Sequence, residues 1–258
     1  MSAARGVTLS GVAGDPGSPI HRLDPRAKIL GLLTVTVVAV TAPLHAWPVF
    51  VACATVLLGV GLAARIGVGD HLRRVRPALV LVVPVAVVVP FVRVGGEAHA
   101  LGPLTVHDAG LHVLASVLVK SALGVSSGAL LTLTTPFPDV LRGLQALRAP
   151  RLLVLIAGLM YRYVFVVADE AGRMRTALTA RSYRPRTVAH AGTLGRLACG
   201  LFLRSYERGE RVHVAMLARG YDGRMPQLVR LRPTRTDTVF VVCIAALLLP
   251  LRLLGAPG

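Results

Sequence analysis

The sequence is poor in charged residues and in cysteine, and both scarcities narrow the class of protein. Charged residues make up only 16% of the 258 positions, whereas a soluble domain carries about 25%. The first 27 residues contain no apolar run of the kind found in a cleavable signal peptide. The three cysteines match no CxxC or metal-ligand spacing, so we interpret them as buried thiols, neither disulfides nor ligands: Cys53, Cys199 and Cys243.

Lysine is rarer still, and its scarcity excludes one kind of catalysis. The only lysines are Lys28 and Lys120, and a Walker A motif needs glycine directly before its lysine. Ala27 and Val119 hold those positions, so this route to ATP hydrolysis is excluded. No nucleophile–base arrangement or pair of carboxylates stands out either. We therefore expect a protein without catalytic residues of its own.

Apolar residues, in contrast, are abundant and occur in blocks. They make up 54% of the chain, and the mean hydropathy is +0.66. A membrane-spanning helix needs about 20 residues, so the first and last blocks need flanking residues to complete a crossing. The pattern predicts an all-α membrane protein with about five transmembrane helices, at Ile29–Ala42, Trp47–Ala64, Pro77–Val92, Ala109–Leu133 and Thr238–Leu251.

The formal net charge of +17 is distributed unevenly along the chain. Of the 29 basic residues, four lie in the tail that ends at Lys28, four in Arg65–Arg76 and eighteen in Thr135–Arg235. If each apolar block crosses once, all three stretches lie on one side, which the positive-inside rule makes cytoplasmic. Such a charge would also suit nucleic acid. The apolar blocks and the absence of a nucleic-acid-binding motif argue instead for the lipid bilayer as the partner.

These observations divide the chain into four predicted parts. They are a cytoplasmic N-terminal tail at 1–27, four transmembrane helices at 28–134, a cytoplasmic helical region at 135–235 and a C-terminal transmembrane helix at 236–258. The third part contains a further apolar stretch, Leu152–Ala168. Arg162 lies in its middle, and a crossing there would export fourteen arginines, so we expect this stretch to lie at the cytoplasmic interface.

The region 135–235 predicts three helices. They run about Asp139–Leu147, Arg151–Arg181 and Val188–Arg219, with Pro185 breaking the second and Gly220 ending the third. In the third helix, a face of mostly apolar residues recurs at steps of three and four: Leu194, Leu197, Leu201, Ser205, Val212 and Met216. The opposite face carries charged residues: Arg204, Glu207 and Arg211.

The second and third helices end in similar tetrapeptides. The first is Ala180-Arg181-Ser182-Tyr183, followed by Arg186, and the second is Ala218-Arg219-Gly220-Tyr221, followed by Arg224. Arginine near a helix C-terminus suits the helix dipole, and glycine suits a left-handed cap, so each end has an ordinary structural explanation. The duplication favours a second explanation, in which each guanidinium presents several donors to a carboxylate of a partner. Two such tips would dock on two copies of a partner, or on two similar partners.

The paired motifs resemble the signature of the transmembrane (T) components of energy-coupling-factor (ECF) transporters, which are ABC importers. The segment Ser205–Tyr221, SYERGERVHVAMLARGY, is similar to the cobalt-transport branch of that family, CbiQ, and so is His21–Lys28, HRLDPRAK. The resemblance covers nearly the whole chain in the same order. Ser182 stands where the pattern has glycine, which puts the cap geometry of the first tip in doubt while its arginine is kept.

The resemblance implies a non-catalytic coupling subunit in the plasma membrane of a bacterium or archaeon. In that role the tips of two crossed coupling helices, within region 135–235, hold two ABC-type ATPase subunits. The chain also contacts a membrane subunit that captures the substrate. The resemblance suggests cobalt as the cargo, with nickel or a vitamin as open alternatives. ATP and Mg²⁺ would bind to the ATPases, and no cofactor to this chain. The implied docking residues are Ala180, Arg181, Ser182, Ala218, Arg219 and Gly220, with Tyr183, Arg186, Tyr221 and Arg224 as secondary candidates.

Two polar features and one alternative function remain open. Lys120, in the fourth apolar block, is either a functional intramembrane charge or part of a helix-packing surface. A stand-alone secondary transporter would show broken midplane helices and a repeat among its spans, whereas only the cytoplasmic helix ends repeat here. A cluster on the predicted outer side suits either a weak divalent-metal site or ordinary interfacial polar residues: His99, His107, Asp108 and His112.

Overall fold

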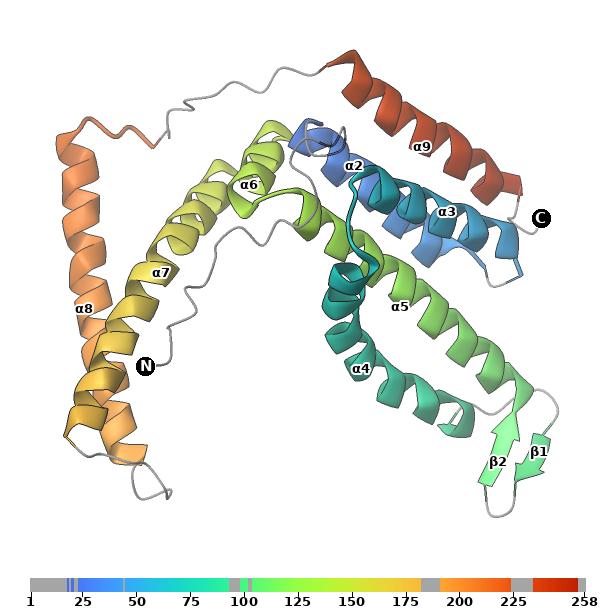
Figure 1. The fold of residues 1–258 in the computed structure, drawn as a ribbon, viewed down its shortest axis with the longest axis horizontal. Coiled ribbons are helices and arrows are strands. Elements are labelled where there is room, and N and C mark those ends of the chain that lie inside the picture. Colours follow the sequence, from blue (N-terminus) through green and yellow to red (C-terminus); the bar gives the residue numbers. More distant parts are fainter. Residues whose placement is uncertain are drawn as a thin grey trace. The chain divides into compact units, whose positions relative to one another are not determined.

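The computed structural model describes residues 18, 20, 23–43, 45–92, 98–101, 104–181, 191–223 and 234–254. The chain divides into two compact units. The first contains residues 1–147 and 231–258, and the second contains residues 148–230. Nearly all the described elements are helices (Figure 1), which confirms the predicted all-α class.

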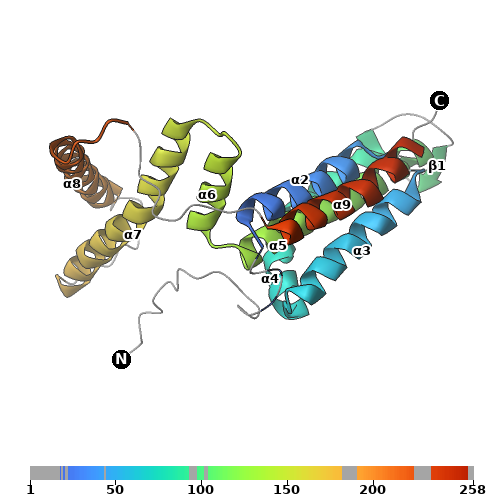
Figure 2. The same ribbon diagram turned by 90° about the horizontal axis from the view of Figure 1, so that it is seen from above.

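The first unit is a helical bundle whose helices correspond to the five predicted apolar blocks, although α4 begins at Val68, within the stretch Arg65–Arg76 that the sequence predicted as a loop before Pro77. The bundle helices are α2 (Pro25–Thr41), α3 (Trp47–Ala63), α4 (Val68–Val92), α5 (Asp108–Thr134) and α9 (Arg235–Leu254). Helix α2 contacts both α5 and α9, α4 packs along α5, and α3 contacts both α5 and α9. Figure 2 shows α9 between α2 and α3. The short helix α6 (Phe137–Ala146) packs on α2 and belongs to the same unit.

Proline and aspartate explain where several of these helices begin. Pro25 occupies the first turn of α2, and the Asp24 side chain caps it by accepting the Arg26 backbone N–H at 2.9 Å. Helices α3 and α6 also carry proline in their first turns, and Asp139 lies in the first turn of α6. The predicted α6 is therefore confirmed, with a start two residues earlier than expected.

The core of the bundle lies along the shared faces of α2, α3 and α9. Val35 and Ala39 of α2 and Cys53 of α3 are fully buried. Helices α2 and α9 approach closely at Gly31, where an added Cβ atom would lie 2.8 Å from the Phe240 ring. Small residues at a helix interface permit such an approach.

Three of the described helical stretches are long and apolar enough to cross a membrane by length and composition: His112–Thr134, Arg151–Ala180 and Arg235–Leu253. Trp47–Ala63 is apolar but shorter. Arg151–Ala180 contains Leu152–Ala168, which we expect to lie at the cytoplasmic interface of the membrane. That location stays a prediction. Arg162, in its middle, is exposed and lies 5.9 Å from the centre of the Tyr163 ring.

One expectation needs correction, and the structure adds one element that the sequence did not predict. Cys53 is buried, but Cys199 and Cys243 are exposed, so the interpretation of all three as buried thiols was wrong. Cys199 lies on α8, most of whose side chains are exposed, and Cys243 lies on an exposed face of α9. Apolar neighbours in the sequence therefore did not make either thiol buried. Between α4 and α5 the structure adds a small antiparallel hairpin of β1 (Ala98–Leu101) and β2 (Leu104–His107).

The outer polar cluster lies largely outside the described side chains. His99 pairs with Val106, and Ala98 with His107, in the backbone register of the hairpin. The side chains of His99, His107 and Asp108 are not among those that the structure describes, and His112 is exposed on α5. Among the described residues no group of three metal-binding side chains occurs. The weak metal site therefore stays an untested prediction.

Candidate functional site

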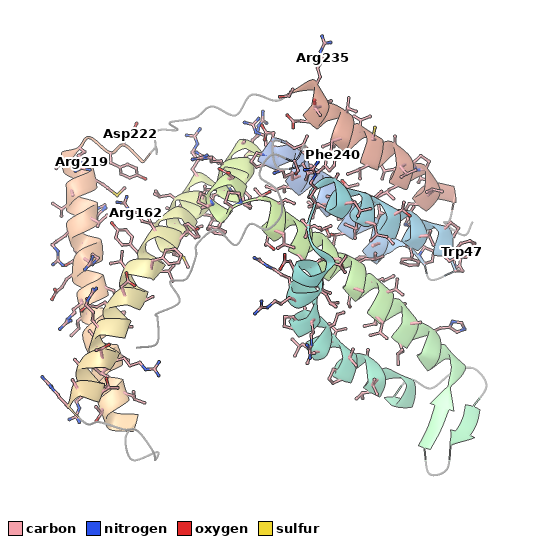
Figure 3. All side chains as sticks on the ribbon, viewed as in Figure 1. Trp47, Arg162, Arg219, Asp222, Arg235 and Phe240 are labelled. Carbon is pink, nitrogen blue, oxygen red and sulfur yellow. The ribbon has the colours of Figure 1, made fainter. Side chains whose placement is uncertain are left out.

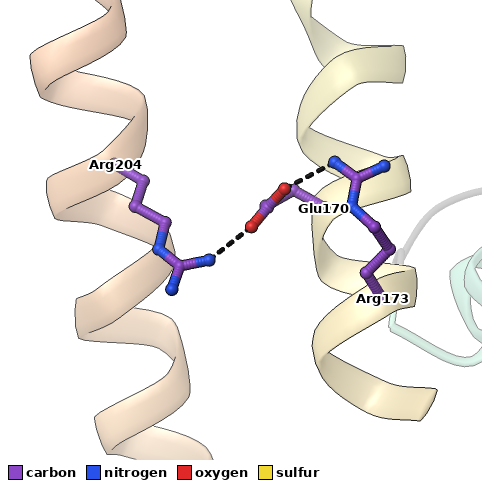
Figure 4. A network of polar contacts seen from close by, with 3 residues as sticks. All are labelled: Glu170, Arg173 and Arg204. Carbon is purple, nitrogen blue, oxygen red and sulfur yellow. Dashed lines mark hydrogen bonds and ion pairs between the residues drawn. The ribbon is translucent and has the colours of Figure 1, made fainter. Parts of the chain in front are cut away.

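The second unit consists of two long helices that cross, α7 (Arg151–Ala180) and α8 (Ala191–Ala218). Glu170 of α7 links them, because its carboxylate accepts from Arg204 of α8 and also from Arg173 one turn along α7 (Figure 4). Glu170 follows the apolar stretch 152–168, and the hydrogen bonds from Arg173 and Arg204 hold the pKa of its carboxyl below the ordinary value. We call these three residues the crossing brace.

The predicted amphipathic face of α8 is confirmed for most of its length. Leu197, Leu201, Ser205, Val212 and Met216 are half-buried, while Leu194 is exposed. The charged residues Arg204, Glu207 and Arg211 are exposed, but Arg204 pairs with Glu170 of α7, so it borders the contact between the helices and does not face away from it.

Between the two helices lies an apolar groove of about 830 Å³. The first half of α7 forms one wall, including Leu155, Leu159 and Tyr163, and the second half of α8 forms the other, including Val212 and Met216. The start of α7 therefore lies along the end of α8, so the helices run in opposite directions (Figure 1).

The end of α8 adopts a well-defined C-terminal cap. Gly220 has a φ of +76°, its N–H donates to the Leu217 carbonyl at 2.9 Å, and the Tyr221 N–H donates to the Met216 carbonyl at 3.0 Å. This pair of bonds is the Schellman motif, which needs a residue with left-handed geometry at the glycine position. Arg219 directly precedes the cap and is exposed at the end of the helix (Figure 3).

The end of α7 differs from that of α8. Arg181 follows the last helical residue, Ala180, with φ −87° and ψ 19°, and its N–H donates to the carbonyls of Ala177 and Leu178. Its side chain is exposed. Ser182, the position that departs from the expected glycine, lies outside the described residues, as do Tyr183, Arg186 and Arg224.

The two arginine tips do not come together. Arg181 is 11 residues beyond Glu170, and Arg219 is 15 residues beyond Arg204. At 1.5 Å per helical residue the tips lie about 16 Å and about 22 Å from the crossing brace. Because the helices are antiparallel, those distances extend in opposite directions and separate the tips by roughly 30–40 Å. One surface of a small partner cannot hold both tips at once.

A buried polar junction in the bundle was not anticipated from the sequence. Asp237 of α9 accepts the Asp24 backbone N–H at 2.8 Å and the Thr234 N–H at 2.7 Å. Nearby, Lys28 of α2 donates to the carbonyl of Thr134, at the end of α5, at 3.2 Å. All four of Asp24, Lys28, Thr134 and Asp237 are buried. This junction ties the starts of α2 and α9 to the end of α5.

The intramembrane lysine has a structural role. Lys120 of α5 donates to the Val40 carbonyl of α2 at 2.9 Å, in the last turn of that helix. Carbonyls there have no partner within their own helix, so the ammonium group satisfies one of them. Ser127 donates to the Leu32 carbonyl at 2.9 Å, and Gly124 lies against Thr36. These contacts support the packing-surface explanation.

Comparisons with known proteins place these features in a family context. The family described as cobalt transport protein, CbiQ, matches residues 16–228. A putative fused cobalt transport protein CbiMQ of Methanocorpusculum labreanum is 30% identical over 220 residues, which are 81% of this chain and 36% of the relative. An energy-coupling factor transporter transmembrane protein EcfT of Brevibacillus brevis is 28% identical over 229 residues, 81% of this chain and 83% of the relative.

A third relative carries a different name. It is a putative ABC transporter ATP-binding protein of Bifidobacterium longum, 30% identical over 223 residues. The match covers 81% of this chain and 28% of that relative. The chain thus spans about a third of the length of the fused and ATP-binding relatives, and most of the length of the EcfT protein.

Proposed function

The chain belongs to the cobalt transport protein (CbiQ) family, and we propose that it is the transmembrane coupling subunit of an ECF-type ABC importer. In this role it transmits the motion of ATPase subunits to a membrane subunit that captures the substrate. The observation that carries the proposal is the pair of exposed arginines, Arg181 and Arg219, at opposite ends of two crossed helices.

The geometry of the tips supports two ATPase contacts. Each arginine lies at the end of a long helix, so a force on the tip acts on the whole helix. The guanidinium group offers planar, multidentate donors that match a carboxylate on a partner. Because the tips lie roughly 30–40 Å apart, one ATPase subunit at each tip is the arrangement that uses both.

The names of two relatives support the partners in the proposal. One relative that contains a segment similar to this chain is named an ABC transporter ATP-binding protein. Another is named a fused cobalt transport protein CbiMQ. Segments joined in one protein commonly act together, so ATPase subunits and a second membrane subunit are the partners we propose. The family description and these names make cobalt the proposed cargo.

In the proposed cycle, ATP binding brings the two ATPase subunits together and moves the tips. The tips lie on opposite sides of the crossing brace, so their displacement changes the angle between α7 and α8. Such a change alters the width of the apolar groove between them. Helix α6, which directly precedes α7 in the sequence and packs on α2, connects that motion to the bundle.

The test is co-purification in detergent of the full chain with ABC-type ATPase subunits expressed from the same organism. Arg181→Glu combined with Arg219→Glu places a negative charge at each tip, which repels an acidic groove on the partner. We expect recovery of the ATPase to fall at least about tenfold, because hydrogen bonds to charged groups contribute about 1.5–3 kcal/mol each. The matched control is Arg175→Glu with Arg196→Glu, two exposed arginines on the same helices away from the tips.

Each outcome has a defined meaning. Loss of the ATPase from the tip variant alone, with unchanged amounts of the chain, supports docking at the tips. Equal loss in the control would assign binding to net charge and reject the specific tips. Full recovery with the tip variant would remove the proposed role of both arginines. The absence of any ATPase partner would favour a stand-alone secondary transporter. Uptake of radioactive cobalt by cells that express the complete set of subunits tests the cargo separately.

A further inference from the structure

A separate apolar pocket of about 290 Å³ lies in the bundle. The second half of α3, the first turn of α4 and the second half of α5 form its walls. Its floor is buried, with Leu57 6% and Leu130 2% exposed. Its mouth is apolar as well but open, because Leu58, Leu62 and Val68 are all more than 60% exposed. Exposed aliphatic side chains around an opening are typical of a surface that binds an apolar ligand or lipid.

The pocket also contains polar groups. Ser126 of α5 and His71 of α4 contribute to its wall. Nδ1 of His71 is buried and has no hydrogen-bond partner among the described residues. A buried polar atom that lacks a partner is destabilising. A ligand with both an apolar part and hydrogen-bonding oxygens would satisfy this nitrogen and fill the pocket.

Basic residues surround the same end of α3 and α4. Arg65 lies in the turn between Leu62 and Ile66, two residues that line the pocket, and adopts a left-handed φ of +52°. Arg74 of α4 donates to the Thr132 hydroxyl at 3.3 Å, two residues beyond the pocket residue Leu130. The segment Arg65–Arg76 holds four arginines and one acidic residue, Asp70, so its net charge is +3 with His71 neutral.

We propose that this pocket binds an anionic phospholipid, with part of an acyl chain between α3 and α5 and the phosphate near the arginines of Arg65–Arg76. An amphiphile of this kind matches both the apolar walls and the local charge. A soluble anion would leave the pocket empty, and a zwitterionic lipid would gain less from a net charge of +3. On the predicted topology this end of the bundle faces the cytoplasm, where membrane leaflets carry anionic lipid. The bound lipid would hold α3, α4 and α5 together.

The experiment uses the full chain in bilayer nanodiscs that contain a trace of photoreactive lipid. One preparation contains a phosphatidylglycerol with a diazirine in its acyl chain, and the other contains the phosphatidylcholine with the same tail. We expect phosphatidylglycerol to label peptides from 54–62 and 123–130 more strongly. Arg73→Gln with Arg74→Gln should lower that preference by up to about thirtyfold, because each basic residue near an anionic surface contributes about 1 kcal/mol.

Two glycines of α3 provide a matched pair of variants. A Cβ at Gly61 would lie 3.6 Å from Leu130, an ordinary contact, so Gly61→Leu extends a side chain into the pocket. A Cβ at Gly59 would meet nothing within 4 Å, so Gly59→Leu adds the same side chain outside the pocket. We expect labelling to be lost in Gly61→Leu and kept in Gly59→Leu, with both variants equally stable to heat in detergent.

Three results would overturn the proposal. Equal labelling by the two lipids would indicate bulk bilayer contact without headgroup selection. Undiminished labelling of Gly61→Leu would place the lipid outside the pocket. Labelling that disappeared when the partner subunits were bound would assign the pocket to a protein interface.

Discussion

At the scale of single residues, arginine and aspartate have different tasks. Most of the described arginines have exposed side chains, several of them in ion pairs, whereas Asp24 and Asp237 are buried and hold backbone groups. The two carboxylates bind backbone groups at very different separations along the sequence. Asp24 caps its own helix through Arg26, and Asp237 reaches a residue 213 positions away in the sequence. Asp237 is therefore the residue on which we expect the bundle to depend most directly.

Replacement of Asp237 by alanine should destabilise the bundle. The change leaves the buried N–H of Asp24 and the partly buried N–H of Thr234 without their acceptor. An unpaired buried donor costs about 1–3 kcal/mol, so we expect a loss of about 2–4 kcal/mol in the free energy of unfolding. Denaturant titration in mild detergent measures it. Asp237→Asn, which keeps one acceptor, should lose less, and Glu210→Ala, at an exposed position of α8, should lose little.

At the scale of elements, two contacts determine how helices meet. In the bundle, Gly143 lets α6 lie directly on α2, since an added Cβ would come within 2.8 Å of Ile29 and 3.3 Å of the Pro25 backbone. In the second unit, the crossing brace joins α7 to α8 through one carboxylate. The first contact depends on the absence of a side chain and the second on a shared charge.

Gly143→Val should displace α6 from α2. The larger side chain would overlap with Ile29 and with backbone, and overpacking typically costs about 1–3 kcal/mol. Hydrogen–deuterium exchange should show faster exchange in α6 and in the first turn of α2. Gly172→Val on α7 is the control, since an added Cβ there meets nothing within 4 Å. Unchanged exchange in α6 would show that α6 does not need this close approach.

Glu170→Gln should loosen the crossing without unfolding either helix. The brace is at the surface, where ion pairs contribute under about 1 kcal/mol, so overall stability should change little. The distance distribution between spin labels at Val164 and Phe202, both exposed, should broaden. Glu207→Gln, which removes an ion pair of Glu207 with Arg211 within α8, should leave the distribution unchanged. A similar broadening in both variants would contradict the role of Glu170.

At the scale of the whole molecule, the number of membrane crossings depends on α7. Helix α7 is apolar and long enough by composition to cross, yet fourteen arginines follow in Asp169–Arg235. The positive-inside rule favours five crossings, with α8 in the cytoplasm. A sixth crossing through α7 would place α8 outside the cell. The exposed Cys199 of α8 is a natural reporter that distinguishes the two arrangements.

A membrane-impermeant maleimide should therefore fail to label Cys199 in intact cells and should label it after permeabilisation. Cys199→Ser should abolish that signal, because Cys53 is buried and Cys243 lies in the predicted span α9. His45→Cys, in the exposed turn between α2 and α3 and in a Cys199→Ser background, should react in intact cells. Labelling of Cys199 from outside would show that α7 crosses the membrane and would reverse the predicted location of both arginine tips.

The sequence by itself determined the class of fold, the bounds of most helices and the left-handed cap at Gly220. These features depend on local properties: apolar blocks, proline in first turns and glycine after a helix end. The tertiary structure alone decided that Glu170 meets Arg204, that Asp237 holds the Asp24 backbone, and that the two tips point away from each other. Such pairs are 34 and 213 residues apart, and no local pattern specifies them, because they depend on how whole helices pack.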